Sequence, residues 1–279
     1  MGVINALWKR NMKIFWRNKP SLILNLTFPF FFMFIFSAVF GQFLGDGVDV
    51  ITFMIAGIIV STMFESSFRI SSSTIDDISG GFMKEILVAP TSRVYIALGQ
   101  FVSSAMVATI QGVLILGISF AFGFRVTSLF TVVYALLAMV FIGLVFAGFG
   151  LMIAAKSKNL QTFQAVSAAV LMPMTFISGA YIPLGALPQV ARWIGYVNPL
   201  SYAVLFFRTI TMELTHLPPS ELLAFDLAFD VGGNIIGWPQ AVGILIIFGG
   251  VFLVASSLSF ARLDFSRLNR KSVTFSFHD

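Results

Sequence analysis

Few residues in this 279-residue sequence have the types and spacing that covalent or metal chemistry requires. The two histidines, His216 and His278, are far apart in the sequence, and neither is near a cluster of carboxylates. There is no cysteine, which excludes disulfides and thiolate metal sites. The sequence also lacks Gly-x-x-x-x-Gly-Lys-Ser/Thr, His-Glu-x-x-His and Gly-x-Ser-x-Gly, the patterns of a phosphate-binding loop, a zinc hydrolase and a nucleophile elbow. We therefore expect no catalytic residue, no metal and no cofactor bound by this chain.

One carboxylate, Glu65, falls inside a segment apolar enough to cross a membrane. An ionisable side chain in such a segment is a candidate functional group. Arg69 follows four residues later, in the order that favours an ion pair along a helix. Two interpretations are open: a structural pair at the cytoplasmic end of the helix, or a group that gates or lines a transport pathway.

A second candidate site is the stretch of residues 171–208, which prolines divide into runs of roughly ten residues, about half of a membrane span. Each proline removes a backbone donor and disfavours helix at the residue before it. In hydrocarbon, such breaks persist only where protein buries them or where they line a wet cavity. The pattern predicts a spanning helix whose chain reverses at Ser178-Gly179 and returns as short half-helices over 181–208. The alternative is a re-entrant loop in an unrelated membrane protein.

A third candidate site is a predicted short amphipathic helix over residues 76–92, between the second and third apolar segments. Its apolar face carries Phe82, Met83, Ile86 and Leu87. Gly80-Gly81 loosens its beginning and Pro90 ends it. Such a helix could dock into the groove of a partner protein or rest on the inner leaflet.

The composition identifies the elements that must position these sites. Hydrophobic residues make up 58% of the chain and charged residues 10%, against about 25% charged in soluble domains. We therefore expect an all-α polytopic membrane protein with one membrane domain over residues 21–261 and no cleaved signal peptide. Its six predicted spans lie near Ser21–Phe40, Val50–Phe68, Tyr95–Phe122, Leu129–Ala155, Thr162–Ala180 and Trp238–Phe260.

The orientation follows from the basic residues. If the N-terminus is cytoplasmic, 14 of the 17 Lys and Arg residues lie inside, and only Arg125, Arg192 and Arg208 lie outside. This asymmetry predicts a cytoplasmic N-terminus and a cytoplasmic tail over 262–279. Because the cations follow the membrane rather than form one basic face, the net charge of +5 does not indicate a nucleic-acid partner.

Three smaller features complete the expected architecture. Residues 1–20 predict an amphipathic helix in the inner-leaflet interface, with cations near anionic lipid.

Residues 209–237 form an outer loop in which a short helix around Ser220–Phe229 is expected, capped by Ser220. In the fourth span, small residues at four-residue spacing let another helix approach closely, either within the chain or at a subunit interface. These are Gly143, Ala147, Gly150 and Ala154.

The proline-broken stretch resembles the permease signature of type-2 ATP-binding-cassette (ABC) exporters. The matching residues are Phe176, Ser178, Gly179, Pro183, Leu187, Pro188, Asn198, Pro199, Leu200, Ser201, Tyr202 and Arg208. The resemblance implies that this re-entrant region forms an outer gate, for which Ser178, Gly179, Pro183, Pro188, Asn198, Pro199, Tyr202 and Arg208 are the candidate residues.

The amphipathic segment is similar to the coupling helix of the same family, which seats in a nucleotide-binding subunit. The resemblance is carried by Gly81, Phe82, Met83, Lys84, Glu85, Ile86, Leu87, Val88, Ala89, Pro90 and Arg93. One departure is that Ile78-Ser79 stands where many members have an Arg-Glu pair. Ile78-Ser79 carries no charge and cannot form a salt bridge of that pair, and Asp76 and Asp77 supply some of the lost polarity.

The resemblance implies a permease subunit in the plasma or inner membrane, paired with a second copy or a homologous permease. ATP and Mg²⁺ would be bound by a separate ABC ATPase subunit. Abundant Phe and Met, 33 and 12 residues, favour a hydrophobic or amphipathic cargo such as a drug, secondary metabolite or lipid-like molecule. The alternatives are a permease for lipid-linked glycans, an ion-coupled carrier or channel, an intramembrane enzyme and a scaffold without transport activity.

Overall fold

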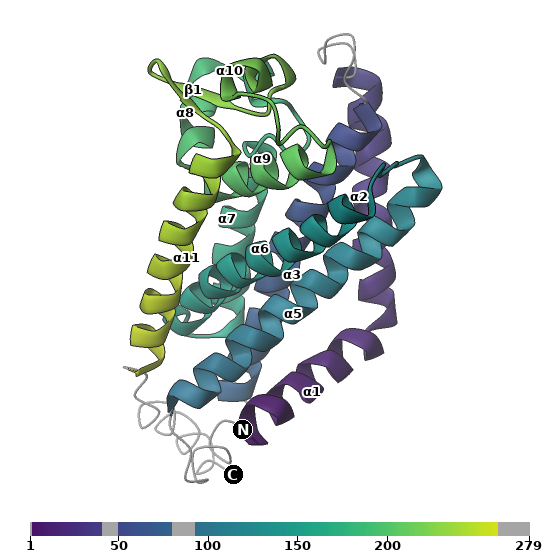
Figure 1. Cartoon of the computed structure of the whole chain (residues 1–279). Helices are drawn as coiled ribbons and strands as arrows, with labels where there is room; N and C mark the ends of the chain where they lie inside the picture. The colour runs from purple at the N-terminus through teal and green to yellow at the C-terminus, as the bar shows by residue number, and fades with distance from the viewer. Residues whose placement is uncertain (1, 41–49, 80–92, 262–279) are drawn as a thin grey trace, which may run out of the picture.

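The computed structural model describes residues 2–40, 50–79 and 93–261. Long helices form the body of the molecule, and short elements gather at one end (Figure 1). The long helices are α1 (Gly2–Arg17), α2 (Lys19–Phe40), α3 (Val50–Ser79), α5 (Arg93–Ser119), α6 (Leu129–Lys156), α7 (Leu160–Phe176) and α11 (Trp238–Ala261). The short elements are η2 (Phe120–Phe122), η3 (Leu184–Ala186), α8 (Gln189–Val197), α9 (Pro199–Thr211), α10 (Pro219–Leu222), η4 (Leu223–Phe225), β1 (Phe229–Val231) and β2 (Asn234–Ile236).

The central helix is α3, which contacts α2, α5, α6, α7 and α9. Every side chain from Thr52 to Phe64 is buried. Thr62 lies in this core, and its hydroxyl donates 2.9 Å hydrogen bonds to the carbonyls of Ile58 and Ile59. Such local bonds let a polar side chain lie among apolar neighbours without an unpaired donor. A helix that is buried on all sides positions the elements packed around it.

Four described helices are long and apolar enough to cross a membrane, within Ile51–Ile75, Ala97–Phe122, Leu129–Lys156 and Trp238–Ser259. They correspond to four of the six predicted spans. The first and fifth predicted spans correspond to α2, whose described apolar part Lys19–Ile35 is shorter, and to α7. The chain is mostly helical as expected, and the six-span architecture stays a prediction.

Two helices end at residues other than the predicted span ends. The second span was expected to end at Phe68, but α3 continues to Ser79. The hydroxyls of Ser71, Ser72 and Ser73 donate to carbonyls one turn earlier, at 2.7–2.8 Å, so the helix tolerates this serine run. The fifth span was expected to reach Ala180, but α7 ends at Phe176, where the chain reverses.

The small residues of α6 serve packing within the chain. A Cβ added at Gly143 would lie 2.9 Å from the Ala105 carbonyl oxygen of α5. A Cβ at Gly150 would lie 2.5 Å from the Ser71 hydroxyl of α3. Of the two interpretations of the small-residue pattern, close packing within the chain is therefore confirmed.

The N-terminal helix α1 lies against α5 at one end of the bundle (Figure 1). Leu7 and Asn11 are buried in this contact. The Asn11 side-chain amide donates a 2.8 Å hydrogen bond to the Gln100 side-chain oxygen of α5. The helix ends at Arg17, and the Asn18 side chain accepts from the Ser21 amide at 3.3 Å at the beginning of α2. The amphipathic helix is thus fixed to the bundle on its apolar side.

The outer loop differs from the expected short helix over Ser220–Phe229. Helix α10 covers only Pro219–Leu222, and its N-cap is Pro218 rather than Ser220. A hairpin follows, in which Phe229 pairs with Ile236 and Val231 with Asn234. Gly232 and Gly233 form its turn with φ of +63° and +88°, a conformation that glycine adopts without strain. This hairpin is a small departure from the all-α prediction.

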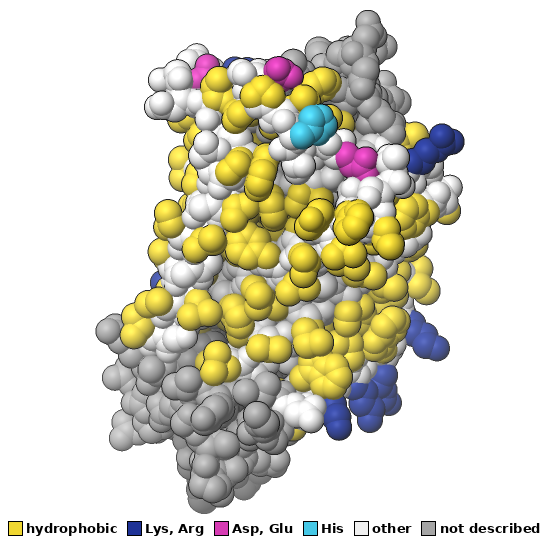
Figure 2. Space-filling view, in the orientation of Figure 1, with side chains coloured by type: hydrophobic (Ala, Val, Ile, Leu, Met, Phe, Trp, Pro, Cys, Tyr) yellow, Lys and Arg dark blue, Asp and Glu magenta, His cyan; other side chains and the backbone are white. Residues whose placement is uncertain are grey.

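The surface is divided as expected for a membrane protein. Figure 2 shows hydrophobic side chains over the middle of the visible face, most of the visible Lys and Arg near the α1 end, and the visible acidic side chains near the opposite end. Large exposed apolar side chains include Phe31, Leu137, Ile247 and Val251. An apolar surface of this kind needs lipid or protein to cover it.

Candidate functional site

The reversal after α7 is fixed by local hydrogen bonds and one glycine. The Ser178 hydroxyl donates to the Thr175 carbonyl at 2.7 Å and accepts from the Ala180 amide at 3.2 Å. Gly179 has φ +83°, in the left-handed region that side chains rarely adopt. The chain therefore stops being helical at Phe176 and turns back toward α3.

The reversal lies directly against the backbone of α3. A Cβ added at Gly57 would be 2.1 Å from the Ala180 carbonyl oxygen. Ala180 itself is fully buried. Only glycine at position 57 lets the two backbones approach this closely.

Arg208 connects the same two segments from α9. Its Nε donates to the Phe53 carbonyl at 3.0 Å, and its Nη2 donates to the carbonyls of Gly179 and Ala180 at 3.0 and 3.3 Å. The side chain is 1% exposed. The sequence placed Arg208 among the outer cations, but the structure places it inside the bundle. There the guanidinium satisfies carbonyls that the broken helix leaves without helical partners.

Asn198 also satisfies backbone groups near the break, at the start of α9. Its side-chain amide donates to the Met174 carbonyl of α7 at 2.7 Å, and its side-chain oxygen accepts from the Leu200 amide at 3.0 Å. Pro199 occupies the first position of the helix, where its missing donor has no consequence. The Tyr202 hydroxyl donates to the Tyr196 carbonyl and so links α9 to the end of α8.

The other two prolines begin the short helices. Pro183 precedes η3 and Pro188 precedes α8. A Cβ at Gly195 of α8 would lie 2.9 Å from the Ile177 carbonyl oxygen, so α8 packs closely against the reversal. The opposite face of α8 is apolar and exposed, through Val190, Trp193, Ile194 and Val197.

Two carboxylates of the outer loop hold this region in place. Asp226 accepts from the amides of Leu184 at 2.9 Å and Gly185 at 3.2 Å. Burial raises the pKa of Asp226 above its ordinary value, while Arg208 and these two amides act in the opposite direction. The outer loop is therefore attached to the first turn of the re-entrant region.

Glu213, just after α9, holds the turn between α5 and α6. Its Oε1 accepts from the Thr131 hydroxyl at 2.7 Å and from the amides of Ser128 and Thr127 at 3.1 and 3.2 Å. These bonds, that from Thr131 above all, hold the pKa of Glu213 below its ordinary value. The carboxylate also lies at the N-terminus of α6, where the helix dipole favours negative charge.

A cavity of about 610 Å³ lies between α2, α3 and α7. Its aromatic lining consists of Phe28, Phe32, Phe68, Phe163, Phe176 and Tyr181. Three of these rings, from Phe32, Phe176 and Tyr181, have pairwise centroid distances of 6.0–6.4 Å beside the reversal. The reversal and the cavity thus share a wall.

The two charged side chains of the cavity are Glu65 and Arg69. The interpretation of Glu65 as an end-of-helix residue was wrong, because α3 runs from Val50 to Ser79 and places it in the middle. Arg69 donates from Nη1 to the Ser21 hydroxyl of α2 at 3.2 Å. Glu65 is half-buried in a mostly apolar wall.

Comparison with known proteins identifies the family of this chain. Residues 3–212 match the ABC-2 type transporter family, and this match covers most of the chain. The chain belongs to the ABC-2 type transporter family. It is a membrane-embedded permease component, as the sequence resemblance predicted.

Curated relatives of this ABC-2 permease are similar over most of their length. Nodulation protein J of Rhizobium meliloti (strain 1021) is 28% identical over 213 residues, which cover 74% of this chain and 80% of the relative. The inner membrane transport permease YadH of Escherichia coli (strain K12) is 24% identical over 241 residues, which cover 84% of this chain and 93% of the relative. The family implies an ABC ATPase as the partner of the permease.

The predicted coupling residues Gly81, Phe82, Met83, Lys84, Glu85, Ile86, Leu87 and Pro90 lie outside the described part of the permease. Arg93, the last of that set, is the first residue of α5. The tail over 262–279 is also outside the described residues.

Among the gate candidates, the structure brings Ser178, Gly179, Asn198 and Arg208 together around the end of α7. Sequence reasoning missed Gly57, Asp226 and Glu213, which hold this region from α3 and the outer loop. Their contacts join residues 41 to 123 positions apart, such as Asp226 with Gly185 and Gly57 with Ala180. No local pattern in the sequence marks pairs of this kind.

Proposed function

We propose that this permease is the transmembrane subunit of an ATP-driven exporter. It would move a hydrophobic or amphipathic substrate out of the cytoplasm or the inner leaflet. A separate ABC ATPase would bind ATP and Mg²⁺, because the chain carries no phosphate-binding loop of its own. The permease itself hydrolyses nothing in this proposal.

The observation that carries the proposal is the aromatic cavity between α2, α3 and α7. Its volume of about 610 Å³ is that of a site for a drug-sized molecule. Flat aromatic rings supply a large apolar contact area and little directional hydrogen bonding. Such walls favour an apolar or amphipathic cargo that is recognised loosely, which also makes a long polysaccharide less suitable.

The reversal and the half-helices α8 and α9 would be the outer gate. Arg208 and Asn198 satisfy the carbonyls at the break, so the closed arrangement is stable without water. Cargo leaving the cavity would have to displace the reversal that forms one end of its wall. The gate would therefore open only when another event changes the packing of α7 or α9 against α3.

That event would begin at the ATPase. Residues 76–92, which begin in the last turn of α3, would seat in a cytoplasmic groove of the ATPase and transmit its closure to α3 and α5. Two permeases, identical or homologous, would pair around the pathway, with both termini in the cytoplasm of a plasma or inner membrane. Nucleotide binding would then shift the pair between two arrangements.

The test is reconstitution with a candidate ABC ATPase. We expect the ATPase to copurify with the permease and its hydrolysis in proteoliposomes to rise when amphipathic compounds are added. The Phe32→Ala variant, which removes a cavity ring, should weaken that stimulation and keep the ATPase bound. An ion-coupled carrier would instead transport without the ATPase, driven by an ion gradient, and this result would refute the proposal.

A further inference from the structure

The aromatic cavity between α2, α3 and α7 contains two opposite charges that are not paired in direct contact. Glu65 and Arg69 lie one turn apart on α3, and both are half-buried in the cavity wall. Arg69 donates from Nη1 to the Ser21 hydroxyl of α2 at 3.2 Å. Within residues 2–40, 50–79 and 93–261, the Glu65 carboxylate forms no hydrogen bond and no contact ion pair. One negative and one positive group are therefore both open to a ligand.

The helices on either side of this cavity run in opposite directions. Gly57, near the beginning of α3, lies against Ala180, which follows the end of α7. Phe68, further along α3, has its ring centroid 6.4 Å from that of Phe163, near the beginning of α7. The cavity therefore has one end beside the beginning of α7 and another beside the reversal.

The two ends differ in polarity. Arg69 of α3 and Gln164 of α7 line the end beside the beginning of α7. The end beside the reversal is aromatic, and the rings of Phe32 and Phe176 lie there with centroids 6.4 Å apart. Glu65 lies between these ends, one turn before Arg69. A molecule with a polar head and an apolar tail fits the cavity in one orientation, with its tail toward the reversal.

A smaller and largely polar hollow adjoins the polar end. It measures about 170 Å³ and shares Arg69 and Ser72 with the cavity. Its other polar lining residues are Asn18, Ser21, Asn25, Ser66 and Ser73. A charged group bound at Arg69 therefore has hydroxyls and amides beside it on the side away from the rings.

Two hydroxyls of α7 also lack partners. Ser167 and Thr175 line the cavity and are 7% and 5% exposed. Neither hydroxyl has a hydrogen-bond partner among the described residues. Because buried polar groups are normally hydrogen-bonded, a cavity wall with two such hydroxyls indicates a ligand that carries polar groups as well as an apolar part.

The balance of charge selects the kind of head group. Glu65 and Arg69 sum to zero, so a ligand with a net charge would leave that charge uncompensated in a mostly apolar wall. A zwitterionic head group keeps the sum at zero and can match both side chains. Its cationic part also meets aromatic rings, whose faces attract ammonium groups, quaternary ones included.

We propose that Glu65 and Arg69 form the head-group site for a single-chain amphiphile with a zwitterionic head group. The Arg69 guanidinium would donate to the anionic part, and the Glu65 carboxylate would lie beside the ammonium. The tail would extend toward the reversal, between the rings of Phe32 and Phe176. A cavity of about 610 Å³ suits a drug-sized molecule, which favours one chain over the two of a phospholipid. This inference rests on the proposed function, because it takes this cavity as the cargo cavity.

The test is binding of three amphiphiles with the same alkyl chain to the full-length permease, measured by native mass spectrometry in a neutral sugar detergent without an ATPase. An alkylphosphocholine carries both charges, an alkyl methyl phosphate only the negative one, and an alkyltrimethylammonium only the positive one. We expect the alkylphosphocholine to bind about ten-fold more tightly than either of the others, the factor that one hydrogen bond to a charged group supplies. Equal affinity of the alkylphosphocholine and either single-charge amphiphile would overturn the proposal, because one of the two side chains would then contribute nothing.

Variants should change the preference among these ligands. Glu65→Gln should remove the preference for the alkylphosphocholine over the alkyl methyl phosphate, and Arg69→Gln should remove the preference over the alkyltrimethylammonium. A uniform loss for all three ligands in both variants would show that the pair only supports packing, and the site would be refuted.

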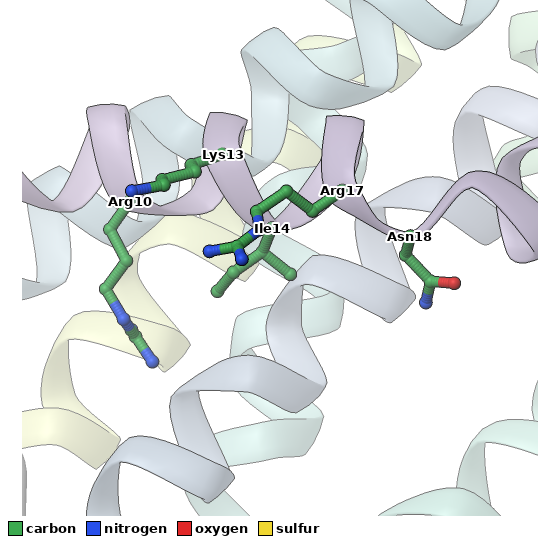
Figure 3. A pocket seen from close by; sticks show the side chains of 5 residues that line it. All are labelled: Arg10, Lys13, Ile14, Arg17 and Asn18. Carbon is green, nitrogen blue, oxygen red and sulfur yellow. The ribbon is translucent and has the colours of Figure 1, made fainter.

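The controls remove charges that do not line the cavity. Glu221→Gln changes an exposed carboxylate of α10, and Arg17→Gln changes an exposed cation that lies with Arg10 and Lys13 around a separate hollow on α1 (Figure 3). Both should keep the wild-type preferences. The same change of preference in a control as in its matched cavity variant would show a general charge effect and overturn the site.

Phosphatidylcholine distinguishes a membrane lipid from a single-chain cargo, because it has the same head group on two chains. We expect it to compete weakly with the alkylphosphocholine. Equal competition would overturn the assignment to a single-chain ligand. None of these measurements needs an ATPase, and loss of the charge preference would leave ATPase copurification and its stimulation by amphipathic compounds unaffected. The head-group site and the proposed function can therefore be refuted separately.

Discussion

The Arg208 guanidinium lies over the Phe53 ring, 3.4 Å from its centroid, and its Nε donates to the Phe53 carbonyl at 3.0 Å. One residue of α3 thus offers both a ring face and a carbonyl to a cation from a helix 155 positions later in the chain. A planar guanidinium can stack on a ring and donate in its own plane at the same time, which an ammonium cannot do. This contact fixes α9 to the central helix at the level of the reversal.

Replacing Arg208 with Met should destabilise the permease. The substitution leaves the carbonyls of Phe53, Gly179 and Ala180 without this donor. We expect the free energy of unfolding to fall by about 2 kcal/mol or more. Arg208→Lys should recover only part of the loss, because an ammonium cannot stack on the Phe53 ring while it donates to these carbonyls. Thermal unfolding in detergent measures both, and Arg125→Met, at an exposed position, is the control. Unchanged unfolding temperatures for both Arg208 variants would contradict the structural role.

Gly57→Ala should be poorly tolerated, because its Cβ would lie 2.1 Å from the Ala180 carbonyl oxygen. The reversal must then move away from α3. Gly117→Ala in α5 is a matched control, since no atom lies within 4 Å of its added Cβ. Ala is the better helix former, so Gly117→Ala should stabilise the permease by up to about 1 kcal/mol. Unfolding temperatures should therefore change in opposite directions.

Variants at the reversal should separate the gate from the coupling element. Gly179→Leu forces a side chain into φ +83°, and Asn198→Leu removes the donor to Met174 and the acceptor for Leu200. We expect lost export with the ATPase still bound. Asn198→Ser, which keeps a small acceptor at the helix N-cap, should retain part of the activity. Normal export by both leucine variants would show that the reversal and the half-helices only connect two spans.

Glu213 should make stability depend on pH in the acid range. The pKa of Glu213 is lowered in the folded state. Its contribution to stability is therefore complete above the ordinary carboxyl pKa range and is lost as the pH falls through the folded-state pKa. The unfolding temperature of the wild type should therefore decrease as the pH drops below about 4.5. Glu213→Gln should lose part of this dependence. Identical pH profiles for the two proteins would refute the prediction.

Leu87→Glu tests the proposed coupling helix. A charge placed in an apolar docking groove should weaken ATPase association by roughly 2 kcal/mol or more, which is about a thirty-fold loss of affinity. Lys84→Glu, on the opposite face of the predicted helix, serves as the comparison and should have a smaller effect. Pull-down of the ATPase measures both. Intact binding and transport by Leu87→Glu would remove residues 81–90 from the coupling role.

The sequence by itself determined the class of the protein and the position of its breaks. Hydrophobic runs, proline spacing and Ser178-Gly179 are local signals, because each acts on the backbone within a few residues. They predicted the long helices, the reversal and the division of residues 181–208 into short helices. They failed where local chemistry continued a helix beyond its apolar part, as the serine hydroxyls do from Ser71 to Ser73 in α3.

Only the tertiary structure decided which distant residues hold the gate region and line the cavity. Arg208 looked like an outer cation, and its burial depends on carbonyls from α3 and the reversal that meet only in the folded chain. Gly57 and Asp226 carried no signal, because their partners are set by packing rather than by spacing. Glu65 became part of a cavity wall once α2 and α7 had packed beside α3. Hydrogen bonds and close contacts between distant segments depend on the assembled fold, and local propensity does not encode them.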